Sequence, residues 1–425
     1  MSINIHLTIL KIFDYGLGIK MKVLIYGINF SPELTGIGKY TGELAFWLAE
    51  KGHDIRVITA PPYYPEWKVD VNYTSYKYKK ENIGNVQVIR CPLYVPKRIS
   101  TIKRFLHLIS FAVTSFFPMV SQIFWRPDII INIAPTLFCT PTMLLIGKLT
   151  KAKTLLHIQD YEVDASLGLG MIKSGLLSKC AYSFEKWCLT RCDKVSSISK
   201  SMINRALEKG VKKENVIFFP NWSEIERFEH VNQNEIDFIK EKLKLPSDKK
   251  IILYSGNINE KQGLEILVEV AGKEIFKDSL FLVVGDGGAK DRLINMVKEK
   301  NITNIRFEKL QPYDLLPALL KVANCHLIIQ RKGAADMVLP SKLTNILAVG
   351  GNTVITAELQ TELGQLCMSF PGIAVLVHPE SVEDLAVGIL KVLELNSVNE
   401  IALSYAKNNL DKNVIISSFI EALSC

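Results

Sequence analysis

The chain has 425 residues, of which 48% are hydrophobic and 22% charged, and its formal net charge is +8 at pH 7. The composition is that of a folded protein, and the length is sufficient for two domains that each bury a core. The mild basic excess suits an acidic membrane surface or anionic substrates, but no basic run has interleaved aromatic residues, which argues against nucleic acid as a partner.

The eight cysteines are scattered, and no Cys-x-x-Cys pair occurs. We therefore expect no zinc site and a reduced, cytoplasmic protein. Residues 1–20 lack a basic start, a long apolar core and a small-residue cleavage site, so they do not fit a signal peptide. We interpret them as an N-terminal extension ahead of a natural start at Met21, the alternative being a short added helix or strand.

The first informative segment is a predicted strand–helix–strand unit. Strands are expected at 23–28 and 54–59, and a helix at 39–51 that ends at Gly52. Gly36 and Gly38 stand just before this helix. Bare amides at a helix N-terminus favour anions, so both glycines are candidate donor-phosphate ligands. The alternative is a loop that needs glycine only for its backbone angles.

An irregular loop follows, because three prolines are interspersed with aromatic residues in 60–80. Its Tyr63, Tyr64 and Trp67 are predicted to be exposed near the ligand edge of the sheet, where they would stack on an acceptor sugar or lipid. The alternative is a loop that its own aromatic residues hold in place.

The segment 98–125 is predicted to be a helix at a membrane surface. No formal charge occurs from Phe105 to Trp125, a length that would suffice to cross a bilayer. Pro118, several polar positions and flanking strands argue against a true span. With Lys103 and Arg104 beside the apolar run, we expect a helix lying in an anionic membrane interface, with a buried core helix as the alternative.

A strand at 154–158 is expected to bring His157 and Asp160 to its C-terminal end, where open α/β sheets bind their ligands. Carboxylates at Asp160, Glu162 and Asp164 follow directly, so this cluster is a candidate for catalysis or acceptor binding. A lone strand-end histidine is otherwise usually structural. The remaining strands of this half are predicted at 86–90, 128–134, 194–198 and 216–219, and helices at 141–148, 176–190 and 200–209.

The second half repeats the pattern after a charged, polar linker at 223–250, which carries one helix near 234–243. Glycine-rich turns follow the first two strands, at 255–263 and at Gly285 to Gly288, and present amides for a donor diphosphate.

Two tandem sets of parallel-sheet pattern predict an α/β protein with two doubly wound, Rossmann-like domains, 21–222 and 251–400. We expect a C-terminal helical segment at 401–425, and one arrangement open to it would pack it back on the N-terminal domain. The expected strands of the second domain are 251–254, 280–284, 305–308, 325–330, 353–356 and 374–377.

The stretch NFSPELTGIGKYTGELAFWLAEKGHDIRVITAPPYYPEWKV resembles the N-terminus of bacterial glycosyltransferase family 4, above all its colanic-acid-type exopolysaccharide branch. The resemblance implies a GT-B fold, in which two Rossmann-like domains face each other across a cleft. It also implies retaining transfer from a nucleoside-diphosphate sugar, GDP- or UDP-linked, to a lipid-linked oligosaccharide at the inner face of the cytoplasmic membrane. A histidine in the matching segment of the family faces the donor sugar, which assigns that role to His157 and an acceptor-side or orienting role to Asp160. Glu162 would bind acceptor, and no protein nucleophile is named.

Two departures from the family pattern concern the donor site. In YSGNINEKQGLE, Asn257 replaces the usual Arg, and Lys261 is the candidate phosphate contact. In AADMVLPSKLTNILAVGG, the family's two glutamates are replaced by Met337, with Asp336 beside it, and by Asn345, which would still hydrogen-bond a ribose hydroxyl. Ser341 and Lys342, at a predicted helix N-terminus, would bind phosphate or sugar, unless Lys342 is only a solvated surface charge.

The sequence bears on the need for a metal and on three functions other than sugar transfer. No Asp-x-Asp motif occurs, so no metal and no cofactor are expected. A dinucleotide-dependent dehydrogenase would need a third glycine after Gly38, which is missing. A GT-B-fold epimerase acting on a free nucleotide sugar would not need the apolar helix or the aromatic loop, and an inactive scaffold of a polysaccharide assembly complex is suggested by the missing glutamates.

Overall fold

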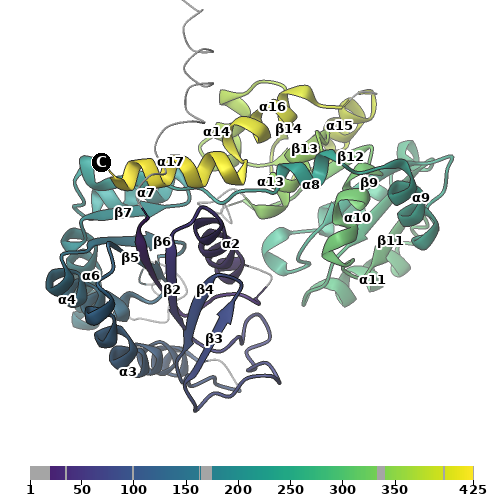
Figure 1. Ribbon diagram of the computed structural model, residues 1–425. Helices are drawn as coiled ribbons and strands as arrows, with labels where there is room; N and C mark the ends of the chain where they lie inside the picture. The colour runs from purple at the N-terminus through teal and green to yellow at the C-terminus, as the bar shows by residue number, and fades with distance from the viewer. Residues whose placement is uncertain are drawn as a thin grey trace, which may run out of the picture. The chain divides into compact units, whose positions relative to one another are not determined.

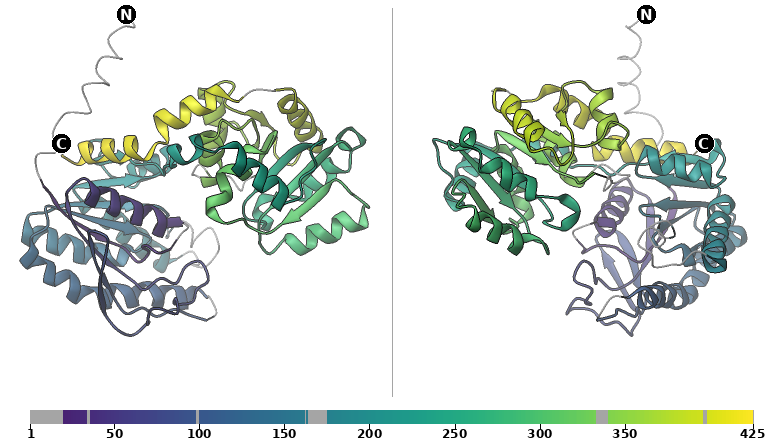
Figure 2. Two further views of the ribbon diagram at one scale, coloured as in Figure 1. Left: turned by 45° about the vertical axis from the view of Figure 1, so that its right-hand side comes forward. Right: turned by 180° about the vertical axis from the view of Figure 1, so that it is seen from behind.

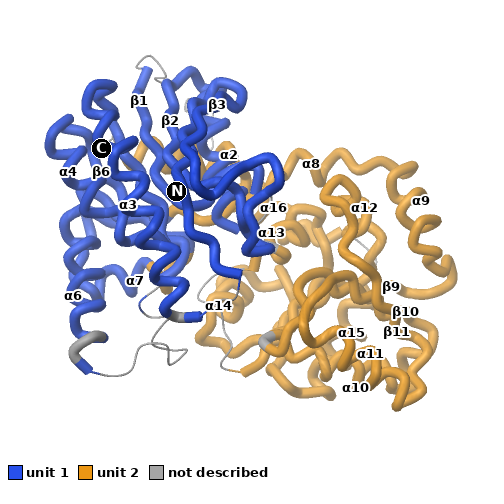
Figure 3. Tube along the Cα trace, turned by 90° about the horizontal axis from the view of Figure 1, so that it is seen from below, with its two compact units in different colours: residues 1–198, 203–218 blue, residues 199–202, 219–425 orange. Residues whose placement is uncertain are grey.

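The computed structural model describes residues 20–33, 36–97, 100–161, 163, 175–332, 340–395 and 398–424. The chain forms two compact units, coloured separately in Figure 3. Unit 1 comprises residues 1–198 and 203–218, and unit 2 comprises 199–202 and 219–425. The N-terminal extension, apart from residue 20, lies outside the described residues, as do the predicted positions Glu162, Asp164, Asp336 and Met337.

Unit 1 contains an eight-stranded sheet in the order β3-β4-β2-β1-β5-β6-β7-β8. All neighbours are parallel except β3, which pairs antiparallel with β4. From β4 to β8 the order reverses direction between β1 and β5, which is the doubly wound arrangement with its ligand-binding crevice at the reversal. The strands are β1 (Lys22–Tyr26), β2 (Asp54–Thr59), β3 (Lys79–Ile83), β4 (Val86–Arg90), β5 (Ile129–Ala134), β6 (Lys153–Ile158), β7 (Lys194–Ser197) and β8 (Val216–Phe218).

Helices cover both faces of this sheet. Figure 1 shows α2 on one face and α3, α4 and α6 together on the other. The central strands are apolar at nearly every position and buried on both sides, as expected where helices cover both faces. The helices are α2 (Gly36–Glu50), α3 (Thr101–Trp125), α4 (Thr140–Thr150), α6 (Leu176–Arg191) and α7 (Lys200–Glu208).

Unit 2 contains a six-stranded parallel sheet in the order β11-β10-β9-β12-β13-β14, with the reversal between β9 and β12. Side chains of β9 alternate between two cores: Ile251 and Leu253 belong to one, and Ile252 and Tyr254 to the other. The strands are β9 (Lys250–Ser255), β10 (Ser279–Val284), β11 (Ile305–Glu308), β12 (Cys325–Ile328), β13 (Thr353–Thr356) and β14 (Val375–Val377). The helices are α8 (Ile225–Glu229), α9 (Gln233–Lys242), α10 (Glu265–Ala271), α11 (Lys290–Glu299), α12 (Leu316–Lys321), α13 (Ser341–Ala348), α14 (Glu362–Ser369), α15 (Val382–Leu393), α16 (Glu400–Asn409) and α17 (Lys412–Ser424).

The structure confirms the fold class and corrects three local expectations. Strand β3 was not predicted, because its sequence KKENI is largely polar and it is an exposed edge strand. The segment 223–250 is not a linker: Phe228 and Ile239 are fully buried in the core of unit 2. Helix α2 begins at Gly36, so Gly36 and Gly38 lie in its first turn and not ahead of it.

Candidate functional site

At the C-terminal edge of the sheet in unit 1, a buried carboxylate covers the first turn of α2. Glu33 is only 6% exposed. A Cβ atom added at Gly38 would lie 2.6 Å from Glu33 Oε2, so only glycine permits this approach. An acidic group near a helix N-terminus stabilises the helix dipole. The Glu33 carboxylate therefore lies directly against Gly38, where it would repel a phosphate, whereas Gly36 remains exposed with a φ of +59°.

The same carboxylate organises the aromatic loop. The backbone amides of Tyr63 and Tyr64 each donate to Glu33 Oε1 at 3.0 Å, and the Asn29 side chain donates to Oε2 at 2.9 Å. Burial is the main influence on Glu33 and raises the pKa of its carboxyl, an effect that the three donors oppose. Glu33 was missed from the sequence because a lone acid after a strand carries no specific signal.

The aromatic loop is largely packed inward. Tyr63 is buried, and its ring contacts Trp67 edge-on at 5.7 Å and His107 of α3 at 4.8 Å. The expectation that Tyr63 is exposed is wrong, since its own neighbours hold it. Trp67 is half-buried, and Tyr64, which is 42% exposed, is the ring of the three that is most open to an acceptor.

Arg90 at the end of β4 ties these loops together. Its side chain is almost fully buried and donates to the carbonyls of Ser31 and Ala60 and to Glu81 Oε1. A buried guanidinium with three satisfied donor groups fixes the two loops that follow β1 and β2. Its role is to position the ligand edge of unit 1.

His157 lies in β6 and is completely buried. Its Nδ1 is 2.9 Å from Ser196 Oγ on β7, and its Nε2 is 3.1 Å from the Gln159 side-chain nitrogen. Burial lowers the pKa of His157 to about 3, so the ring is neutral at physiological pH. Asp160 is exposed just beyond the strand. Because the ring is buried and both of its nitrogens lie against neighbouring side chains, His157 would reach a sugar only if this cluster rearranged.

In unit 2 the two glycine-rich turns pack against each other. A Cβ atom added at Gly285 would lie 1.9 Å from the Gly256 carbonyl oxygen, and one at Gly287 would lie 2.4 Å from the Ile258 carbonyl oxygen. The amide of Gly285 donates to the Glu308 carbonyl, and the amide of Gly287 to its neighbour Asp286. The expectation that these amides are open to a phosphate is corrected: Gly285 and Gly287 are required for the close approach of two backbones.

Lys342 lies at the start of a helix, as the sequence predicted, and its side chain contacts Tyr254. It lies in the first turn of α13, with its Nζ 4.4 Å from the centre of the Tyr254 ring and 3.3 Å from Tyr254 Oη. The Tyr254 hydroxyl in turn donates to the Asn257 carbonyl at 2.6 Å. This places the cation at the end of β9, beside the sheet reversal where doubly wound domains bind ligands, and next to the first glycine turn.

The other candidate donor residues fall near this point. Asn257 is exposed in the first turn, and Asn345 on α13 accepts a 3.0 Å hydrogen bond from Ser223 Oγ, so its Oδ1 is already engaged. The backbone of Lys261 lies in a short 3-10 helix, Glu260–Gln262, and that of Ser341 begins α13; their side chains are outside the described part of the structure. No group of three His, Cys, Asp or Glu side chains suited to a metal ion occurs among the described residues.

Helix α3 combines a buried side of mixed polarity with an outer side that is largely apolar. Its buried side includes His107, Ser115 and Gln122, which are hydrogen-bonded to Tyr94 O, Tyr26 Oη and Arg56. Its outer side is apolar at helical spacing and consists of Ile102, Leu106, Ile109, Val113, Phe116, Phe117 and Phe124. Lys103 is exposed and Arg104 half-buried near its N-terminus.

The comparisons with known proteins identify the family. Residues 35–222 match the glycosyl transferase 4-like domain, and residues 235–409 match the glycosyl transferases of group 1. The chain is a glycosyltransferase of this family. It is 59% identical over 403 residues to a protein of Escherichia coli K12 that is provisionally named the colanic acid biosynthesis glycosyl transferase WcaI; the match spans 94% of this chain and 99% of that one.

Solved structures share the fold of this glycosyltransferase. Sucrose-phosphate synthase from Thermosynechococcus elongatus superimposes with a TM-score of 0.69 at 15% identity, covering 95% of this chain and 98% of that one. Anabaena HepE in complex with UDP gives a TM-score of 0.65 at 13% identity, covering 95% and 100%. The fold is therefore GT-B, with two Rossmann-like domains, as expected.

Proposed function

We propose that this glycosyltransferase moves a sugar, with retention of configuration, from a nucleoside-diphosphate sugar to a lipid-linked oligosaccharide in the synthesis of a colanic-acid-type exopolysaccharide. The observation that carries the proposal is the 59% identity to the Escherichia coli protein named for colanic acid biosynthesis, which extends over nearly the full length of both chains. Identity at this level over two complete domains favours a shared reaction class.

The donor side of the proposal rests on Lys342. The Lys342 cation lies over the Tyr254 ring at the end of β9 and in the first turn of α13. A diphosphate there would interact favourably with the lysine charge and with the positive end of the helix dipole. Similar GT-B structures were solved with UDP and with UDP-glucose bound, which favours a nucleotide-sugar donor here. In the reaction, Lys342 would stabilise the charge that develops on the leaving nucleoside diphosphate.

The acceptor side rests on α3. The structure describes one helix, Ile102–Trp125, that is long and apolar enough to cross a membrane by length and composition, and 33% of its most apolar stretch is buried. Because three of its polar residues pair inside unit 1 while a row of apolar residues faces outward, we propose that it lies in the membrane interface and does not span the bilayer. The enzyme would thereby meet a lipid-linked acceptor at the inner surface of the cytoplasmic membrane.

Calorimetry with a panel of UDP-, GDP-, ADP- and dTDP-sugars, without added metal, tests the donor assignment. Selective binding of one nucleotide sugar supports it and names the base. That sugar would then be supplied together with lipid-linked oligosaccharides extracted from a polysaccharide-producing strain, and the anomeric configuration of the product read by NMR. Transfer with inversion would refute retention, interconversion of the free nucleotide sugar would indicate an epimerase, and binding to none with no turnover would favour the inactive scaffold.

A further inference from the structure

A pocket of about 340 Å³ lies in unit 1, far along the sequence from the candidate donor residues. It is formed where α4 and α6 end and where β6 begins. Its lining residues are Leu144, Gly147, Lys148, Lys151, Ala152, Lys153, Thr154, Arg191 and Asp193. The strands of a parallel sheet start at this edge, whereas Asp160 and the aromatic loop lie beyond the opposite, C-terminal edge.

The pocket is strongly cationic. Four of its nine lining residues carry a positive charge, and the single carboxylate, Asp193, accepts hydrogen bonds from the amide and hydroxyl of Thr154 at 2.8 and 2.7 Å. Among the described residues, no ion pair involves Lys148, Lys151 or Arg191. Each of the two helix C-termini contributes about half a negative elementary charge, so the pocket keeps a net charge of about +2.

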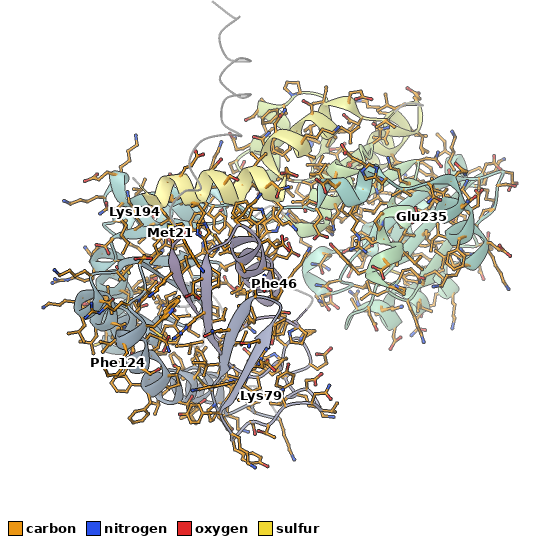
Figure 4. The ribbon with its side chains drawn as sticks, in the orientation of Figure 1. Met21, Phe46, Lys79, Phe124, Lys194 and Glu235 are labelled. Carbon is orange, nitrogen blue, oxygen red and sulfur yellow. The ribbon has the colours of Figure 1, made fainter. Side chains whose placement is uncertain are left out.

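The pocket interrupts an apolar surface. Lys148 stands between Leu145 and Leu149, both exposed on the outer side of α4. The neighbouring helices end at the same edge of the sheet with exposed aromatic residues, Phe124 on α3 and Trp187 on α6. Figure 2 shows these three helices as one layer from two directions, and Figure 4 shows Phe124 at its outer surface. Cations flanked by leucine and aromatic side chains are the composition of a surface that enters the headgroup region of a bilayer.

We propose that this pocket binds the phosphate group of an anionic phospholipid, and that it fixes the helix layer α3–α4–α6 on the membrane. The inference rests on the proposed membrane association and adds to it a headgroup site with its own residues. Charge complementarity favours a phosphate, and the apolar rim favours a phosphate carried by a bilayer over one free in solution. Bound at the starting edge of the sheet, the lipid would leave the opposite, ligand-binding edge of unit 1 open to an acceptor.

Vesicle co-sedimentation of the full chain tests the site. Vesicles of phosphatidylglycerol mixed with phosphatidylcholine are compared with vesicles of phosphatidylcholine alone. The pocket variant is Lys148→Gln/Lys151→Gln, and the matched control is Lys240→Gln/Lys242→Gln, which removes two exposed lysines from the last turn of α9 in unit 2. Since one basic residue near an anionic surface strengthens binding about fivefold, the pocket variant should lose affinity for the anionic vesicles about thirtyfold. The control should stay within about twofold of the wild type at the same ionic strength.

Further measurements distinguish a failure of the headgroup site from a failure of the proposed function. Phe117→Ser/Phe124→Ser should weaken binding to both vesicle types, whereas the pocket variant should weaken binding to the anionic vesicles alone. Nucleotide-sugar binding should be unchanged in both, because neither variant touches unit 2. Equal losses in the pocket variant and the α9 control would overturn the headgroup site while leaving the apolar face of α3 intact. Saturable binding of inorganic phosphate at the pocket, with no preference for anionic vesicles, would overturn the lipid assignment.

Discussion

Replacing Lys342 by Gln removes a positive charge that the structure holds directly against Tyr254 at the end of β9. The side chain is half-buried, so an effective dielectric constant of about 20 applies, and a unit charge at about 4 Å contributes roughly 4 kcal/mol of Coulomb energy. Part of this is offset because lysine and phosphate both lose water. Hydrogen bonds to charged groups contribute about 1.5–3 kcal/mol net. We therefore expect the Kd for the nucleotide sugar to rise about 10- to 150-fold.

Isothermal calorimetry of the full chain with the donor identified in the panel measures this change. Lys298→Gln is the matched control, because Lys298 is an exposed cation at the end of α11 in the same unit and its loss changes the net charge equally. The difference in Kd between Lys342→Gln and the wild type should become smaller as salt is added, because screening weakens the wild-type charge interaction. Lys342→Arg should recover part of the affinity.

Thermal unfolding distinguishes a local from a global effect. Lys342 contributes no buried apolar surface to either core of unit 2, so the melting temperature of Lys342→Gln should stay close to that of the wild type. A Kd equal to that of the wild type in a folded variant would refute the donor assignment, and Lys342 would then be a solvated surface charge. A loss of equal size in Lys298→Gln would attribute the effect to net charge.

Three further predictions follow from the packing. Gly285→Ala should lower the free energy of unfolding by at least about 2 kcal/mol in urea titrations, because its Cβ would lie 1.9 Å from a carbonyl oxygen, whereas Gly288→Ala, with no heavy atom within 4 Å, should not. The pKa of His157 is lowered in the fold, so the unfolded chain binds more protons below about pH 6.5; stability should fall on acidification by up to about 1.4 kcal/mol per pH unit, and His157→Asn should flatten that slope. Identical slopes would argue that the ring is accessible to protons. Charge reversal at Lys103 and Arg104 should shift the protein from membrane to soluble fractions, and an unchanged distribution would favour a helix that belongs to the protein core.

The sequence predicted where some residues of the candidate site lie in the fold, but it did not predict their contacts with residues distant in the chain. The position of Lys342 after Pro340 predicted a cation in the first turn of a helix, and α13 begins at Ser341. Nothing local predicted that Tyr254, 88 positions earlier, would hold it. The same limit applies to Glu33, whose partners Tyr63 and Tyr64 lie across a strand and a helix, and whose burial no local pattern indicates.

The sequence by itself determined the two doubly wound domains. Short apolar runs that alternate with amphipathic segments are compatible with few folds other than a parallel sheet covered by helices. It also determined that a helix would follow near residue 100, because a long apolar run without charge favours one; α3 spans Thr101–Trp125. Only the tertiary structure decided which side of α3 faces outward: His107, Ser115 and Gln122 find hydrogen-bond partners on unit 1, and their apolar neighbours are left exposed. It likewise decided that Gly285 and Gly287 serve the packing of two turns and that His157 is buried. Such outcomes depend on contacts between residues distant in the chain, which composition and spacing do not specify.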